Sequence, residues 1–94
     1  MSATIDELTV NYEEEGVLVR KEITKEVLSK GAWSTIMFKY QDFDQKIEDY
    51  GEAKAMVVRF RKIKGEYRKQ SSFNISSPKQ ALAMAKILNE WFEV

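Results

Sequence analysis

The sequence predicts an α+β fold: an antiparallel sheet of about five strands with one C-terminal helix packed on one sheet face. Two observations lead to this prediction. Four glycines separate short runs that are rich in β-branched and aromatic residues, as in sheets whose strands are joined by turns. The last run is instead rich in helix formers and begins with a capping motif. With 94 residues and no interdomain linker, the chain is predicted to be a single domain over residues 1–94.

The N-terminal part, about residues 7–24, is predicted to form a hairpin. Apolar residues alternate in "LTVNY", which predicts a strand, and "EEEG" follows as the turn. The returning strand runs into residues 21–30, which also fit one face of a helix that would end at the next glycine. The frequent Val, Ile and Thr residues favour a strand there.

Central strands are predicted over about residues 32–75, and "AWSTIMFKYQDF" is the clearest of them. Successive side chains of a strand point to opposite faces. Ile36, Phe38 and Tyr40 are therefore predicted to face the helix. The opposite face then carries Trp33, Thr35, Met37, Lys39 and Gln41. The polar segment "DQKIEDYGE" is predicted to connect this strand to the next.

The last two strands are predicted to form a hairpin with Lys64-Gly65 as its turn. A two-residue turn there pairs Arg61 with Arg68, Arg59 with Gln70, Val58 with Ser71, and Met56 with Phe73. The face toward the helix then carries Met56, Val58, Phe60, Phe73 and Ile75. The opposite face carries Arg59, Arg61, Arg68, Gln70, Ser72 and Asn74.

A C-terminal helix is predicted over about residues 77–93. Ser77 is the expected N-cap, Pro78 takes the first helical position, and Gln80 completes a capping box. This helix is apolar over most of its circumference, which predicts burial on more than one side. We expect a second subunit to supply the additional cover and make the protein a homodimer. The predicted dimer contacts are Met84, Ile87 and Trp91. The alternative is that a loop or the N-terminal hairpin covers the helix.

Charge is distributed unevenly, although the net charge is zero. Residues 1–50 hold eleven acidic and six basic side chains, whereas residues 51–94 hold four and nine. Seven of the 15 basic residues lie between Lys54 and Lys69, together with one acid. Such asymmetry indicates contact with nucleic acid or a membrane surface. The alternative is a pair of oppositely charged surfaces that meet within or between subunits.

The basic hairpin predicts an anion-binding surface. Like charges opposite each other in a sheet are destabilising, and a phosphate bound between Arg61 and Arg68 would relieve that cost. Acids of the 42–52 loop could neutralise them instead. An exposed Trp33 beside the arginines is typical of a single-strand binder, although Trp33 could also belong to a second core or a dimer contact. The predicted nucleic-acid contacts are Trp33, Lys39, Lys54, Arg59, Arg61, Lys64, Arg68 and Gln70.

Histidine and cysteine are both absent, which argues against the common general bases, thiolate nucleophiles and zinc sites. No glycine-rich phosphate loop is present. We therefore expect neither an enzyme nor a cofactor. The N-terminus does not resemble a secretory signal and no run is long enough to span a membrane, so a cytoplasmic location without membrane contact is expected.

The stretch "GEYRKQSSFNISSPKQALAMAKIL" joins a basic strand to a capped helix. In this it resembles the transcriptional coactivator (positive-cofactor-four) type of single-stranded-DNA-binding domain. The similarity covers about residues 17–92 and consists of the order of the elements. It implies a dimer that binds unpaired nucleic acid on a basic sheet face, in a transcription-related role. The "EEEG" turn and the long "DQKIEDYGE" connection depart from the family's pattern.

The sequence thus predicts a module that binds single-stranded DNA or RNA. The alternative is a protein-interaction module whose basic hairpin docks an acidic partner or a second subunit. Lipid headgroup binding, as in pleckstrin-like domains, ranks last because that fold needs more strands.

Overall fold

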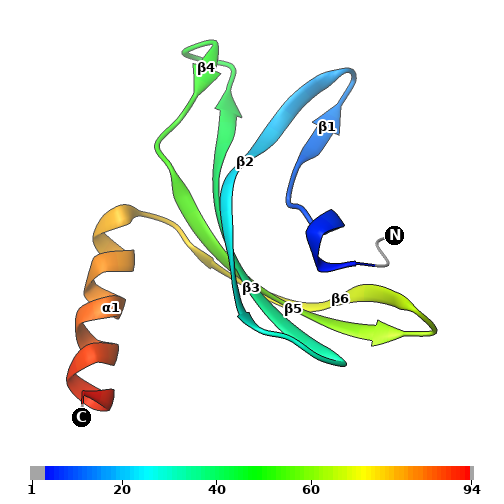
Figure 1. Ribbon diagram of the computed structural model, residues 1–94. Helices are drawn as coiled ribbons and strands as arrows, with labels where there is room; N and C mark the ends of the chain where they lie inside the picture. The colour runs from blue at the N-terminus through cyan, green and yellow to red at the C-terminus, as the bar shows by residue number, and fades with distance from the viewer. Residues whose placement is uncertain (1–3, 94) are drawn as a thin grey trace.

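In the computed structural model, which describes residues 4–93, the chain forms one curled antiparallel sheet followed by a helix (Figure 1). The elements are η1 (Ile5–Glu7), β1 (Tyr12–Glu14), β2 (Val17–Ser29), β3 (Trp33–Asp44), β4 (Asp49–Tyr50), β5 (Lys54–Ile63), β6 (Glu66–Ile75) and α1 (Pro78–Phe92). The strand order is β1-β2-β3-β5-β6, and the short β4 pairs with β3 outside this path. The predicted α+β class, with its antiparallel sheet and C-terminal helix, is confirmed.

The hydrophobic core lies on the concave face of the sheet. Its buried members come from β3, β5 and the N-terminal segment: Leu8, Ile36, Phe38, Tyr40, Met56, Val58 and Phe60. Ile36 and Phe38 are completely inaccessible to solvent, whereas Met37 between them is exposed. The predicted alternation along β3 is therefore confirmed.

Two tight turns connect the hairpins β1-β2 and β5-β6. Both central residues have positive φ angles, 51° and 81° at Glu15-Gly16 and the same values at Lys64-Gly65. Such turns match the right-handed twist of the strands that they join. The predicted turn at Lys64-Gly65 is confirmed.

The N-terminal segment differs from its prediction. "LTVNY" was expected to be a strand, but β1 begins only at Tyr12, and η1 lies in the hollow of the sheet (Figure 1). Leu8 is buried in the core and Val10 packs against it, so this stretch covers the sheet instead of extending it. The ambiguous residues after Arg20 are strand up to Ser29, as favoured from their composition.

The segment expected to be a plain connection, "DQKIEDYGE", contains β4. Phe43 pairs with Tyr50 and Asp44 with Asp49, so β3 continues into a small hairpin of its own. The Phe43 and Tyr50 rings meet edge to face with 5.5 Å between their centroids. The Tyr50 hydroxyl also donates to the Leu18 carbonyl at 2.7 Å, which ties this hairpin to β2.

The helix begins as predicted but lies elsewhere. The Ser77 hydroxyl accepts a hydrogen bond from the Gln80 N–H, and Pro78 is the first helical residue. The Gln80 side chain accepts from Ser76 instead of from the cap residue, so the capping box is only half formed. None of the helix residues Pro78–Phe92 is buried, and Figure 1 shows α1 standing beside the sheet on its convex side. The prediction that α1 covers the apolar sheet face is wrong, because the N-terminal segment occupies that face.

The register between β5 and β6 explains this position. Arg61 pairs with Arg68 as predicted, but a bulge between Lys69 and Ser71 shifts every later pair by one residue. The observed pairs are Arg59 with Ser71, Val58 with Ser72, Val57 with Phe73, Met56 with Asn74, and Ala55 with Ile75. The predicted faces of Ser72, Phe73, Asn74 and Ile75 are therefore wrong, since a one-residue shift exchanges the two faces of a strand. Because Ile75 ends β6 on the convex side, the helix starts on that side.

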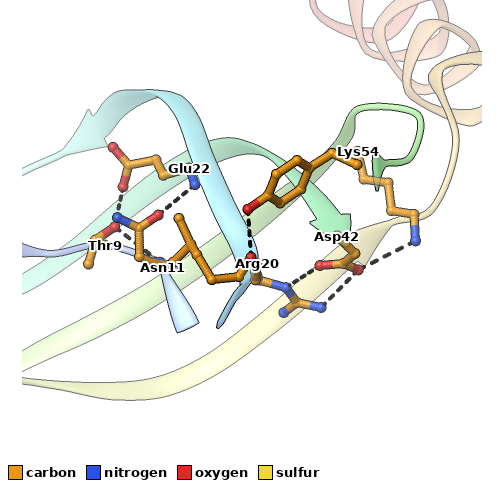
Figure 2. Close-up of polar contacts among 8 residues, drawn as sticks. Thr9, Asn11, Arg20, Glu22, Asp42 and Lys54 are labelled. Carbon is orange, nitrogen blue, oxygen red and sulfur yellow. Dashed lines mark hydrogen bonds and ion pairs between the residues drawn. The ribbon is translucent and has the colours of Figure 1, made fainter. Parts of the chain in front are cut away.

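Polar contacts hold the N-terminal segment on the sheet. The Lys25 ammonium donates to the carbonyls of Ile5, Asp6 and Leu8 at 2.9, 3.0 and 2.7 Å, which uses all three of its hydrogens. Figure 2 shows a second set of contacts, in which Thr9 donates to the Glu22 carboxylate at 2.7 Å. The Glu22 N–H in turn donates to the Asn11 side chain at 2.7 Å.

Lys25→Met should test this anchor. It removes three charge-assisted hydrogen bonds but keeps the length of the side chain, so the free energy of unfolding should fall by about 1–3 kcal/mol. Urea denaturation measures the change. Lys30→Met, at an exposed position that has no hydrogen bond or ion pair within residues 4–93, is the control and should shift stability by less than about 0.5 kcal/mol. Equal stability of the two variants would contradict the anchoring role.

Candidate functional site

The convex face of the sheet, opposite the core, brings the predicted aromatic and basic residues together. In the observed register, Trp33 of β3, Arg61 of β5 and Arg68 of β6 lie side by side in one row across the sheet. The next row holds Thr35, Arg59 and Ser71. We call Trp33, Arg59, Arg61 and Arg68 the arginine–tryptophan cluster. It forms because β3 buries its even-numbered side chains and so turns its odd-numbered ones outward.

Two guanidinium groups stack on the Trp33 indole. The Cζ atoms of Arg59 and Arg61 lie 4.7 and 5.3 Å from the ring centroid. Cation–π contacts at exposed sites are worth about 0.5–1 kcal/mol each. Trp33 nevertheless keeps 43% of its surface exposed. The arginines therefore hold the indole in place without covering it.

The cluster carries a net positive charge. Arg68 has an ion pair with Glu66 at 3.7 Å, but within residues 4–93 no carboxylate lies within ion-pair distance of Arg59 or Arg61. The alternative prediction was that acids of the 42–52 loop neutralise these arginines. Asp42, one of these acids, does not pair with them. Asp42 pairs with Arg20 and Lys54 at the concave face instead. Like charges are thus held close together without compensation from the fold.

The remaining predicted contacts are divided between several places. Lys39 lies on the convex face, two rows beyond Arg59 and opposite Ala55. Lys64 is at the tip of the β5-β6 turn. Gln70 is the extra residue of the bulge, and its side chain donates to the Arg68 carbonyl at 3.3 Å. Lys54 pairs with Tyr40 on the core side and lies 3.6 Å from Asp42, so the fold does not bring it to the cluster.

The sequence did not predict one residue of the convex face, Phe73. Phe73 lies in a row with Val57 and Met37, directly beyond the row that holds Arg59. The predicted register assigned Phe73 to the core, and the bulge moves it to the outside. The short polar run "QSS" before it is the only sequence signal for an irregular strand, and such a run does not locate a bulge.

A second group of charged side chains, Arg20, Asp42 and Lys54, lies on the concave face. Arg20 donates to both Asp42 oxygens at 2.8 and 3.3 Å (Figure 2). Its guanidinium also stacks over the Tyr40 ring at 4.6 Å. The hydrogen bond from Arg20 lowers the pKa of Asp42 below its ordinary value and outweighs the opposing effect of partial burial. The same bond raises the pKa of Arg20. Each charge has its partner within the fold, which indicates a structural role for this pair.

The described residues contain no group of three His, Cys, Asp or Glu side chains that could hold a metal ion. No helix among them is long and apolar enough to cross a membrane. Comparisons with protein families, curated proteins and solved structures found no match to this chain.

The Arg20–Asp42 pair predicts a specific acid dependence of stability. A carboxyl whose pKa is lowered by folding stabilises the fold above its unfolded pKa, and this contribution is lost as pH falls through the folded pKa. Both side chains are about one-third exposed, so Asp42→Asn should cost only about 0.2–1 kcal/mol at pH 7. The difference in stability from wild type should disappear when the pH is well below about 3.9, which is the ordinary pKa of an Asp side chain.

Thermal unfolding across a pH series measures this effect. Asp6→Asn is the control, because the Asp6 carboxylate is exposed and only its backbone carbonyl meets Lys25. A cost of Asp42→Asn that stays constant at acid pH would show that the ion pair is not its source.

Proposed function

We propose that the protein binds single-stranded nucleic acid, DNA or RNA, on the convex face of its sheet. The observation that carries the proposal is the arginine–tryptophan cluster. An indole that is 43% exposed lies beneath two guanidinium groups that have no carboxylate partner among residues 4–93. Uncompensated cations beside an accessible aromatic ring fit a ligand that is both anionic and flat. Nucleotides have both properties.

The chemistry of binding follows from the positions of these side chains. The guanidinium groups of Arg59, Arg61 and Arg68 would bind phosphate oxygens, for which their planar donor geometry is suited. A base would stack on the exposed part of Trp33, an interaction worth about 1–3 kcal/mol that does not depend on base identity. Unpaired strands offer their base faces for stacking, whereas a duplex hides them. The cluster thus favours single strands with little sequence preference.

We also propose that the protein is a homodimer through α1. No residue of Pro78–Phe92 is buried, and Trp91 is 71% exposed. A 15-residue helix with little tertiary packing is only marginally stable in water. The radius of gyration is 15.0 Å, larger than the ~12 Å of a compact chain of this length. A second copy that covers Met84, Ile87 and Trp91 would supply the missing cover.

Binding should depend on the cluster and on salt. Fluorescence anisotropy with labelled single-stranded and duplex DNA of equal length should show preference for the single strand. In Arg59→Ala/Arg61→Ala the affinity for single strands should fall at least about tenfold. The slope of log affinity against log salt should become shallower by about 1.4, since each lost single-strand phosphate contact contributes about 0.7.

The matched control is Lys79→Ala/Lys86→Ala, which removes the same charge from exposed positions on α1. Absence of single-strand binding at low salt, or equal losses in the two double variants, would contradict the proposal. Binding of an acidic protein surface by the basic hairpin would then become the better account.

The dimer is tested separately. Light scattering after size exclusion should give twice the mass of one chain for wild type and the mass of one chain for Ile87→Glu/Trp91→Glu. The helical signal in circular dichroism should fall in the variant, because the uncovered helix frays. Glu90→Gln on the same helix should leave both unchanged. A wild-type monomer that keeps its full helical signal on dilution would rule out this interface.

A further inference from the structure

We infer that Phe73 is a second base-stacking position, so that a bound strand crosses the sheet from Trp33 on β3 to Phe73 on β6. This inference rests on the proposed binding of nucleic acid and adds a residue and a path to it. Its basis is the bulge at Gln70, which turns Phe73 away from the core and onto the face that carries the arginines.

Phe73 is accessible where it lies. Its side chain is 53% exposed, and no ring contact to it is found among residues 4–93. In the same row, Val57 separates it from Met37, which is itself 37% exposed. This apolar row lies directly beside the row of Thr35, Arg59 and Ser71. A base on Phe73 would therefore have its phosphate within reach of Arg59.

The spacing of the two rings sets the length of the ligand. Met37 is four residues from Trp33 along β3, which amounts to about 13 Å at roughly 3.3 Å per residue. β6 is two strands from β3, about 10 Å away at roughly 4.8 Å per strand. The rings are thus about 16 Å apart along a diagonal. At about 3.4 Å per stacked step, about five steps, and so about six nucleotides, would span that distance, and an extended strand would need fewer.

The arginines lie along this diagonal. Arg61 is beside Trp33, and Arg59 lies between the row of Trp33 and the row of Phe73. A strand that followed the diagonal would meet an aromatic ring at each end and guanidinium groups in between. This alternation is what a sequence-tolerant single-strand path requires. The ligand class is therefore an unpaired oligonucleotide long enough to reach both rings, which takes about six residues when its bases stay stacked.

The test compares Phe73→Leu with wild type on two oligothymidylates, one of about eight nucleotides and one of about two. Leucine keeps an apolar side chain on the surface but removes the ring. For the longer oligonucleotide the dissociation constant should rise about tenfold, whereas for the dinucleotide, which is too short to reach both rings, it should change less than about twofold. Phe73→Trp keeps a ring and should bind the longer oligonucleotide at least as tightly as wild type.

Tyr12→Leu is the matched control, because it removes an exposed ring from β1, remote in strand order from β6. If wild type binds neither oligonucleotide at low salt, the proposed function itself fails. If wild type binds and Trp33→Leu weakens binding, but Phe73→Leu behaves like Tyr12→Leu, only the second stacking position is overturned. Loss of the dimer in Phe73→Leu with unchanged binding would also overturn it, since Phe73 would then belong to a subunit contact.

Discussion

The burial of Ile36, Phe38 and Tyr40 on one side of β3 determines where the other side chains of the sheet point. Ile36 and Phe38 have no solvent access, and they pack against the N-terminal segment that Lys25 anchors from β2. A strand that buries its even-numbered residues must expose its odd-numbered ones. Trp33 is thereby placed on the convex face, and pairing with β5 brings Arg59 and Arg61 beside it. The proposed binding surface is thus a consequence of how the core is packed.

The two faces of the sheet differ in whether their charged side chains have partners of opposite sign. On the concave side, Arg20 and Asp42 form a bidentate pair that also involves Lys54, and each of these charges has a partner of opposite sign within the fold. On the convex side, Arg59 and Arg61 share an indole and have no acidic partner among residues 4–93. The unpaired arginines on the convex face repel each other, and this repulsion locally destabilises the fold. Such conflicts are expected at functional sites, where the ligand supplies the missing partner.

Local patterns predicted much of this arrangement, and long-range packing produced the rest. The alternation along β3, the Lys64-Gly65 turn and the Ser77 cap depend on neighbouring residues, and the structure has all three. The bulge at Gln70 depends on how β6 fits its partner strand, and no residue type marks it. The place of Leu8 in the core depends on a contact with distant strands, so a short alternating run was mistaken for a strand. These two features also explain why the helix and Phe73 were assigned to the wrong face.

The central claim is that the convex face around Trp33 binds unpaired nucleic acid. The most direct test is a titration of isotope-labelled protein with an unlabelled oligothymidylate of about eight nucleotides, followed by NMR. The account predicts that the Trp33 indole N–H and the side-chain signals of Arg59 and Arg61 shift most, while Ile36 and Phe38 in the core stay unchanged. Saturable shifts confined to the concave face or to α1, or no shifts at low salt, would contradict it.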